Sequence, residues 1–267
     1  DWTAMVQRLY HPERTVRVAL VGKYTELHDA YLSVVESLLH AGTAHSTAVD
    51  IDWIDASTLT DDTVTAARLA GIQGIVVPGG FGDRGIEGMI RAAHFARTAG
   101  VPYLGLCLGM QILVIEFARH VLGLPQAHST EMDRDTPDPV IALMPDQNGV
   151  VLGGTLRLGK FRCALTPGTL AHRAYDGAAE IGERHRHRYE FMNSYRPAFE
   201  AAGACFSGVN PERDLVEITE ITGHPWMLGV QFHPEFKSRP NRPQPLFREF
   251  IGAVCEGYSD VSLRRNS

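Results

Sequence analysis

The sequence PYLGLCLGMQILVIEFARHV, residues 102–121, passes without a break from one element of secondary structure to the next. Its first part, Pro102-Tyr-Leu-Gly-Leu106, is a short apolar run, which is typical of a parallel strand buried on both faces. Its second part, 108–121, has the spacing of a helix, with apolar residues at Met110, Leu113, Val114, Phe117 and Val121. Alternation of strand and helix is the signature of an α/β fold.

The same alternation extends over the first 120 residues. Apolar strands are expected at 16–22 and 74–77, and helices at 28–42, 61–70 and 86–99. A short helix is expected within residues 1–15. The pattern predicts an α/β fold with a doubly wound, mostly parallel sheet flanked by helices.

The alternation of strands and helices ends after residue 123. Residues 123–150 are rich in Pro, Asp and Asn and are expected to form a long excursion over one edge of the sheet. A hairpin of strands 203–209 and 214–220 would be a small antiparallel addition to the sheet. Further elements are expected as strands at 151–165 and 226–232 and as helices at 169–174 and 246–256.

Composition excludes several classes of protein. The chain has 267 residues, a net charge of −6 and a pI near 6.1, which argues against a nucleic-acid surface. No apolar run approaches the ~20 residues that cross a bilayer, so we expect no membrane association. The first residues, Asp1 to Met5, have neither the basic nor the apolar segment of a signal peptide. They also lack an initiator Met, which suggests a segment of a longer protein.

The cysteines carry information of their own. Cys107, Cys163, Cys205 and Cys255 are scattered without CxxC spacing, which fits neither a disulfide framework nor a zinc site. We therefore expect reduced thiols and a cytoplasmic location.

Gly105-Leu-Cys107-Leu-Gly109 lies between the buried strand and its helix, as in the G-x-S-x-G nucleophile elbow with Cys in place of Ser. Small residues are needed on both sides because the turn is tight and the backbone of the nucleophile is strained. A helix N-terminus also favours thiolate over thiol. Taken alone, the motif is equally compatible with a buried structural cysteine.

His233-Pro-Glu235 favours the catalytic interpretation. This segment follows an apolar strand, so His233 should emerge at the carboxyl edge of the sheet, where Cys107 also emerges. Glu235 can accept a hydrogen bond from one imidazole nitrogen and leave the other facing the thiol. The alternative is a surface histidine beside a turn-forming proline.

Pro78-Gly-Gly-Phe-Gly-Asp-Arg-Gly85 contains a formal G-x-G-x-x-G pattern. A dinucleotide site is disfavoured, because this is not the first strand–turn of the sheet and the next strand ends in Gly-Leu-Cys. We expect an oxyanion loop instead, with the N–H groups of Gly80 and Leu108 directed at the developing negative oxygen. A glycine-rich turn without a ligand is the alternative.

Two further segments are ambiguous. Residues 154–160 nearly match a Walker A sequence, but Phe161 stands where Ser or Thr would hold magnesium, so a mobile loop is expected. Glu183-Arg-His-Arg-His-Arg-Tyr-Glu190 is expected to be a solvated edge, or to supply an arginine that clamps a carboxylate. The spacing of its histidines does not favour a metal, and no metal site is expected.

Together these motifs resemble the class I (triad) glutamine amidotransferases, which have a flavodoxin-like fold, and within them the CTP synthase family. The resemblance covers essentially the whole chain and includes Val21-Gly-Lys-Tyr24, Pro78–Gly82, Gly105-Leu-Cys-Leu-Gly-Met-Gln111, Gly153–Gly159, Glu183–Glu190 and Gln231-Phe-His-Pro-Glu-Phe236.

The resemblance implies roles for individual residues. Cys107 would form a γ-glutamyl thioester, His233 would shuttle protons and Glu235 would orient the histidine. Arg188 would hold the α-carboxylate of glutamine and Glu131 its α-amine. The glutamine pocket and oxyanion strand would be formed by Gly79, Gly80, Phe81, Gln111, Glu131, Arg188 and Tyr189.

The resemblance also implies a larger protein. Residues 1–15 would be the remnant of an interdomain linker, 16–257 the amidotransferase domain and 258–267 a flexible tail. Ammonia would pass to a missing amidoligase domain that converts UTP to CTP with ATP and Mg. GTP would activate through a lid near Arg157. No cofactor is expected in this domain, and the fragment is expected to be a monomer.

Two other functions remain open from the sequence. The chain could be a regulatory or glutamine-binding module that is silent by itself. It could also be a related class I hydrolase, such as a γ-glutamyl peptidase.

Overall fold

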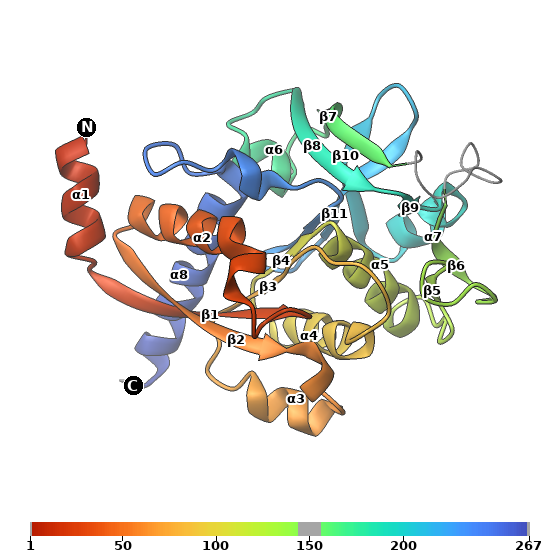
Figure 1. Ribbon diagram of the computed structural model, residues 1–267, viewed down its shortest axis with the longest axis horizontal. Helices are drawn as coiled ribbons and strands as arrows, with labels where there is room; N and C mark the ends of the chain where they lie inside the picture. The colour runs from red at the N-terminus through yellow and green to blue at the C-terminus, as the bar shows by residue number, and fades with distance from the viewer. Residues whose placement is uncertain (1, 144–155, 266–267) are drawn as a thin grey trace.

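The computed structural model describes residues 2–143 and 156–265. Its main sheet has the strand order β2-β1-β3-β4-β12-β11-β10-β7-β8 (Figure 1). The strands of this sheet are β1 (Arg14–Gly22), β2 (Thr47–Asp55), β3 (Gly74–Val77), β4 (Tyr103–Leu106), β7 (Arg157–Leu165), β8 (Glu180–His187), β10 (Ala204–Asn210), β11 (Leu215–Ile221) and β12 (Met227–Val230).

The sheet has two parts that meet at β12. From β2 to β12 all neighbouring strands are parallel, and from β12 to β8 all are antiparallel. A second, three-stranded sheet consists of β5 (His128–Ser129), β6 (Pro139–Leu143) and β9 (Tyr189–Phe191). The expected α/β class is confirmed, with the antiparallel strands continuing the parallel sheet.

Helices cover both faces of the sheet (Figure 1). A buried hydrophobic cluster lies on each face of the sheet. One cluster contains residues of α2 and α8, and the other contains residues of α4 and α5. The helices are α1 (Trp2–Tyr10), α2 (Leu32–Ala44), α3 (Asp62–Arg68), α4 (Ile86–Ala99), α5 (Leu108–His120), α6 (Leu170–Ala174), α7 (Arg196–Ala201) and α8 (Pro245–Arg265). Short 3-10 turns are η1 (His28–Tyr31), η2 (Ala56–Thr58), η4 (Asn193–Tyr195) and η5 (Pro234–Lys237).

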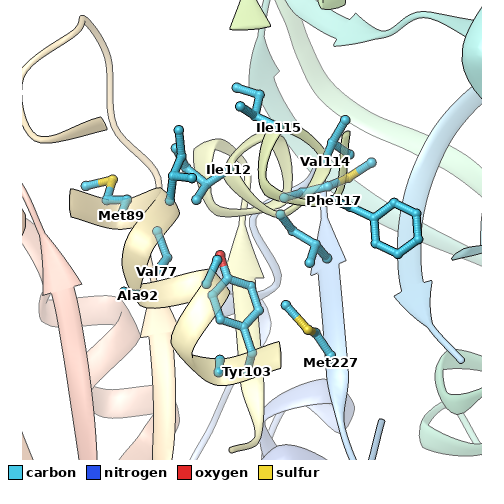
Figure 2. Close-up of a cluster of buried hydrophobic side chains, with 14 of the residues drawn as sticks. Val77, Met89, Ala92, Tyr103, Ile112, Val114, Ile115, Phe117 and Met227 are labelled. Atoms are coloured by element: carbon cyan, nitrogen blue, oxygen red, sulfur yellow. The ribbon is translucent and has the colours of Figure 1, made fainter. Parts of the chain in front are cut away.

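Helix α5 is the centre of one of these clusters. Every residue from Leu108 to Ala118 is buried, because the sheet, α4 and the small sheet enclose the helix. Figure 2 shows Ile112, Val114 and Phe117 of α5 in the cluster that also contains Tyr103 of β4. The Tyr103 hydroxyl donates a 2.8 Å hydrogen bond to the Gly109 carbonyl, which joins strand and helix just beside Cys107.

Several expected elements differ from those observed. The sequence reasoning missed β2, the edge strand beside β1, as well as β5, β6, β8 and β9. The excursion at 123–150 contains β5 and β6 rather than only loop. The last helix continues to Arg265, so most of the expected tail is helical. Within the described residues no helix combines the length and apolar character needed to cross a membrane.

Candidate active site

Cys107 lies in the sharp turn between β4 and α5. Its φ of 51° and ψ of −97° place a non-glycine residue on the positive-φ side of the Ramachandran map, a conformation that costs about 1–3 kcal/mol and persists only when the surroundings enforce it. The Cys107 N–H donates to the Val230 carbonyl at 2.7 Å, and the Cys107 carbonyl accepts from the Met110 N–H at 3.1 Å. The neighbouring strand and the first helical turn therefore hold the strained residue.

The glycines that flank Cys107 are sterically required. A Cβ at position 105 would lie 2.5 Å from the carbonyl group of Gly109, and a Cβ at position 109 would lie 2.1 Å from the Val77 carbonyl oxygen. Real Cβ atoms do not approach backbone atoms so closely, so the helix could not pack against β3 with any larger residue at position 109. The expectation that the elbow needs small residues on both sides is confirmed.

His233 emerges beside Cys107 because β12 and β4 are parallel neighbours, with Val230 opposite Leu106. The His233 Nδ1–H donates to Glu235 Oε1 at 2.7 Å, which directs Nε2 away from the carboxylate. The backbone of Gly79 lies against both side chains, because a Cβ there would be 2.8 Å from His233 Cε1 and 3.6 Å from Cys107 Cβ. The structure thus brings together the three residues that the sequence predicted would act in concert.

The electrostatics of this group favour a charged imidazole. Burial lowers the pKa of His233, but hydrogen bonds and charge attraction from Cys107 and Glu235 outweigh it and raise the pKa to about 10. At neutral pH His233 is therefore an imidazolium hydrogen-bonded to the Cys107 side chain. Such an arrangement provides a proton donor next to a nucleophilic sulfur.

The glycine-rich segment 78–85 connects β3 to α4 and covers the elbow. Lys23, at the end of β1, donates through Nζ to the carbonyl oxygens of Phe81, at 3.1 Å, and of Gly82. The Gly82 N–H donates to Glu131 Oε1 at 3.4 Å. Burial lowers the pKa of Lys23 to about 8, although nearby Glu131 opposes the change. Lys23 was not among the predicted site residues, although the quoted motif Val21–Tyr24 contains it.

Cys107 lies between two cavities. The smaller cavity has an accessible volume of about 20 Å³ and is lined by Gly80, Phe81, Cys107, Leu108, Gln111, Glu131, His187, Arg188 and Tyr189. The larger, of about 300 Å³, includes Gly79, Gly80, Phe81, Arg186, His233 and Glu235 in its wall. Every residue predicted to touch glutamine or the oxyanion therefore lines one of the two cavities. His187 lines the smaller one and was missed.

The sequence predicted a mobile loop around Arg157, but Arg157 lies in a strand. It begins β7, is 4% exposed, and donates through Nη2 to Glu217 Oε1 at 2.5 Å. The interpretation of 154–160 as a mobile loop is therefore wrong from residue 157 onward, because these residues pair with β8. Residues 153–155 of the expected lid lie outside the described part of the chain.

The cluster at 183–190 is not a solvated edge either. In β8 the side chains alternate, with Glu183, His185 and His187 buried and Arg184 and Arg186 exposed. The inward side chains bind one another, as His185 Nδ1 lies 2.9 Å from His187 Nε2. His187 is therefore buried and lines the small cavity instead of facing solvent.

Among the described residues, three potential metal ligands meet far from this site, at the other end of α5. They are His94, Glu116 and His120. Arg97, however, already donates hydrogen bonds of 2.7 to 3.0 Å to both oxygens of the Glu116 carboxylate. The arrangement is that of a buried ion pair with two flanking imidazoles.

Comparison with known proteins agrees with this geometry. Residues 26–253 match the family described as glutamine amidotransferase class-I. The chain is 59% identical over 264 residues to CTP synthase of Rubrobacter xylanophilus, covering 99% of this chain and 48% of that protein. It is 62% identical over 254 residues to CTP synthase of Thermomicrobium roseum, covering 95% of this chain and 46% of that protein.

A solved structure has the same fold as this chain. The glutaminase domain of Trypanosoma brucei CTPS with bound acivicin superposes with a TM-score of 0.85 at 36% identity, covering 90% of this chain and 94% of that chain. The chain therefore belongs to the class-I glutamine amidotransferase family. Within this family it corresponds to the glutaminase domain of CTP synthases. It spans about half the length of those curated relatives, 48% and 46% in the two cases above.

Proposed function

We propose that this domain hydrolyses the side-chain amide of glutamine to glutamate and ammonia, with Cys107 as the nucleophile. The observation that carries the proposal is the buried contact between the strained Cys107 and an imidazolium that Glu235 holds by a 2.7 Å hydrogen bond. A sulfur nucleophile, a proton donor and an orienting carboxylate are the parts that acyl transfer needs.

The first half of the reaction forms a thioester. The Cys107 sulfur attacks the amide carbon, and the negative charge that develops on the amide oxygen is stabilised by the N–H groups of Gly80 and Leu108. His233 donates its Nε2 proton to the amide nitrogen, the C–N bond breaks, and ammonia leaves. The products of this step are a γ-glutamyl thioester on Cys107 and a neutral imidazole.

The second half regenerates the enzyme. Neutral His233 removes a proton from water, the hydroxide attacks the thioester carbon, and the C–S bond breaks with its electron pair on sulfur. Glutamate leaves, and the thiolate and imidazolium are restored. Glu235 keeps the imidazole in the orientation that both steps require.

Glutamine would occupy the small cavity. We assign its α-carboxylate to Arg188 and its α-amine to Glu131, with Phe81, Gln111 and Tyr189 as the wall. This assignment is supported by the position of all five residues around the cavity next to Cys107. A volume of about 20 Å³ is about that of one water molecule, so glutamine must widen the cavity. The weak 3.4 Å contact from the Gly82 N–H to Glu131 is the bond that the substrate amine would replace.

The relatives extend the proposal beyond this chain. Because they are named CTP synthases and are about twice as long, we propose that an amidoligase domain uses the ammonia to convert UTP to CTP with ATP and Mg. We further propose GTP as an activator that acts through the region around Arg157. The isolated domain would be a monomer. The four free cysteines are consistent with a reducing, cytoplasmic location.

Glutamate release from glutamine tests the proposal, with Cys107→Ala as the blank and with or without GTP. Turnover in the wild-type domain that disappears in Cys107→Ala is the expected result. Equal turnover in the two proteins would overturn the assignment of the nucleophile.

A further inference from the structure

A second polar side chain reaches the Cys107 sulfur besides His233. Gln231 follows β12 directly and is completely buried. Its Nε2 donates to Cys107 Sγ at 3.7 Å, within hydrogen-bonding range for a sulfur acceptor. Its backbone N–H donates to the Glu217 carbonyl at 2.9 Å, so the main chain at this position is held by β11. A buried amide N–H that points at the sulfur stabilises the sulfur when it is negatively charged.

The orientation of the Gln231 amide follows from its other partner. Gln111 Nε2 donates to Gln231 Oε1 at 3.4 Å and to the Tyr189 carbonyl at 3.3 Å. Because a backbone carbonyl can only accept, Gln111 must present its amino group on this side. Gln231 must then present its oxygen to Gln111 and its amino group to sulfur. The opposite orientation would set two amino groups against each other and a carbonyl oxygen against the sulfur.

The Tyr189 carbonyl is held from the other side by the histidines of β8. His187 Nδ1 lies 3.2 Å from this carbonyl oxygen. Burial, together with repulsion from Arg157, lowers the pKa of His187 to about 3, so the ring is neutral. It therefore donates from Nδ1 to the carbonyl and accepts at Nε2 from His185 Nδ1, 2.9 Å away. A continuous set of hydrogen bonds runs from these histidines through Tyr189, Gln111 and Gln231 to the sulfur.

We propose that Gln231 is a further catalytic residue, whose side-chain amide donates a hydrogen bond to the Cys107 thiolate. The inference rests on the proposed role of Cys107 as the nucleophile. The thiolate is the attacking group in the first half of the reaction and the leaving group in the second, whereas the thioester sulfur is neutral. A donor at this place stabilises the charged sulfur at both ends of the cycle. Gln111 is a positioning residue that orients Gln231 and joins it to the glutamine cavity.

The pH dependence of Cys107 alkylation by iodoacetamide tests this role, with the site of labelling identified by peptide mapping. Gln231→Met preserves the approximate size of the side chain and removes the donor. Gln244→Met is the matched control, because Gln244 is also buried but binds Tyr175 and α8 instead. Circular dichroism and thermal unfolding report on the fold of each variant.

We expect the pH profile of Cys107 alkylation to move about one unit higher in Gln231→Met, equivalent to about 1.4 kcal/mol. On the acidic, rising part of the profile the variant should therefore react about tenfold more slowly than the wild type. Gln244→Met should keep the wild-type profile even if its unfolding temperature falls. An unchanged profile in a folded Gln231→Met protein would overturn the inference while leaving the nucleophile intact. Failure of wild-type Cys107 to react ahead of Cys163, Cys205 and Cys255 would instead refute the proposed function.

A measurement on the unaltered residue covers the case in which Gln231→Met does not fold. In a ¹⁵N-labelled wild-type domain, the side-chain NH₂ resonance of Gln231 should move with pH as the sulfur gains charge. The movement should disappear in Cys107→Ala. A resonance that does not respond to pH in the wild-type domain would contradict the proposed hydrogen bond.

Discussion

Removal of the Glu235 carboxylate should weaken catalysis less than removal of His233 itself. The bond at stake is the 2.7 Å hydrogen bond from His233 Nδ1 to Glu235 Oε1, where both partners are largely buried. Hydrogen bonds to charged groups contribute about 1.5–3 kcal/mol. A loss of about 2 kcal/mol corresponds to about a 30-fold decrease in kcat/KM. His233→Ala removes the proton donor altogether and should cost about 10²–10⁴-fold.

The pH profile provides an independent check of the same bond. Glu235 helps to raise the pKa of His233 to about 10. Without the carboxylate, the imidazolium loses its proton at lower pH, so the alkaline fall in kcat/KM begins earlier. A loss of about 2 kcal/mol moves this limb about 1.5 pH units lower. The control Glu235→Gln retains an oxygen acceptor without the charge and should fall between the wild type and Glu235→Ala.

The assay is glutamate release from glutamine between pH 6 and 10.5, at substrate concentrations below KM. Alkylation of Cys107 in each variant verifies that the site is folded. If Glu235→Ala and His233→Ala lose the same activity, Glu235 does more than orient the imidazole. An alkaline limb that stays in place in Glu235→Ala would refute the electrostatic argument.

Three further predictions concern the elbow, the glutamine cavity and the buried arginine. Gly109→Ala should destabilise the fold by about 3 kcal/mol or more, because its Cβ would lie 2.1 Å from a backbone oxygen. Gly257→Ala is the control, because a Cβ there would have no atom within 4 Å. Equal unfolding temperatures of the two variants would contradict the reasoning. Glu131→Ala should raise KM for glutamine about tenfold or more with a smaller change in kcat, and a loss confined to kcat would argue against contact with the substrate amine. Arg157→Met leaves the Glu217 carboxylate buried without its cation, so urea unfolding should show a loss of about 3 kcal/mol, and a loss below about 1 kcal/mol would mean that the pair contributes little.

The parallel half of the sheet, apart from its edge strand β2, and the nucleophile elbow could be predicted from the sequence. Strands β3 and β4 throughout, and β1 from Val18 onward, are apolar without interruption because they are covered on both faces. The position of Cys107 relative to His233 then follows from topology, since parallel strands end at one edge of the sheet.

The antiparallel half was harder because polar side chains point inward. In β8 the buried positions are Glu183, His185 and His187, so the period of two shows no alternation between apolar and polar residues. These side chains are buried because they find partners elsewhere in the fold; Glu183, for example, accepts a hydrogen bond from Tyr175, which directly follows α6. Such pairings between distant parts of the chain leave no local signal.

The edge strand β2 was missed because it is too exposed, and not because its buried positions are polar. It is only partly buried over most of its length, so its sequence lacks a continuous apolar run. Gln231 was overlooked although it lies in a quoted motif, because only the structure shows which face of the strand end it occupies. The local chemistry of a motif can be predicted from the spacing of its residues. The partners of buried polar groups can be identified only once the fold is known.

Direct detection of the covalent intermediate tests the central claim most sharply. The domain is mixed with glutamine, quenched in acid within its first turnovers, and analysed by intact and peptide mass spectrometry. We predict a mass increase of one glutamyl group confined to the peptide that contains Cys107, and no increase in Cys107→Ala. Glutamate production without any such adduct, or at an undiminished rate in Cys107→Ala, would contradict the account.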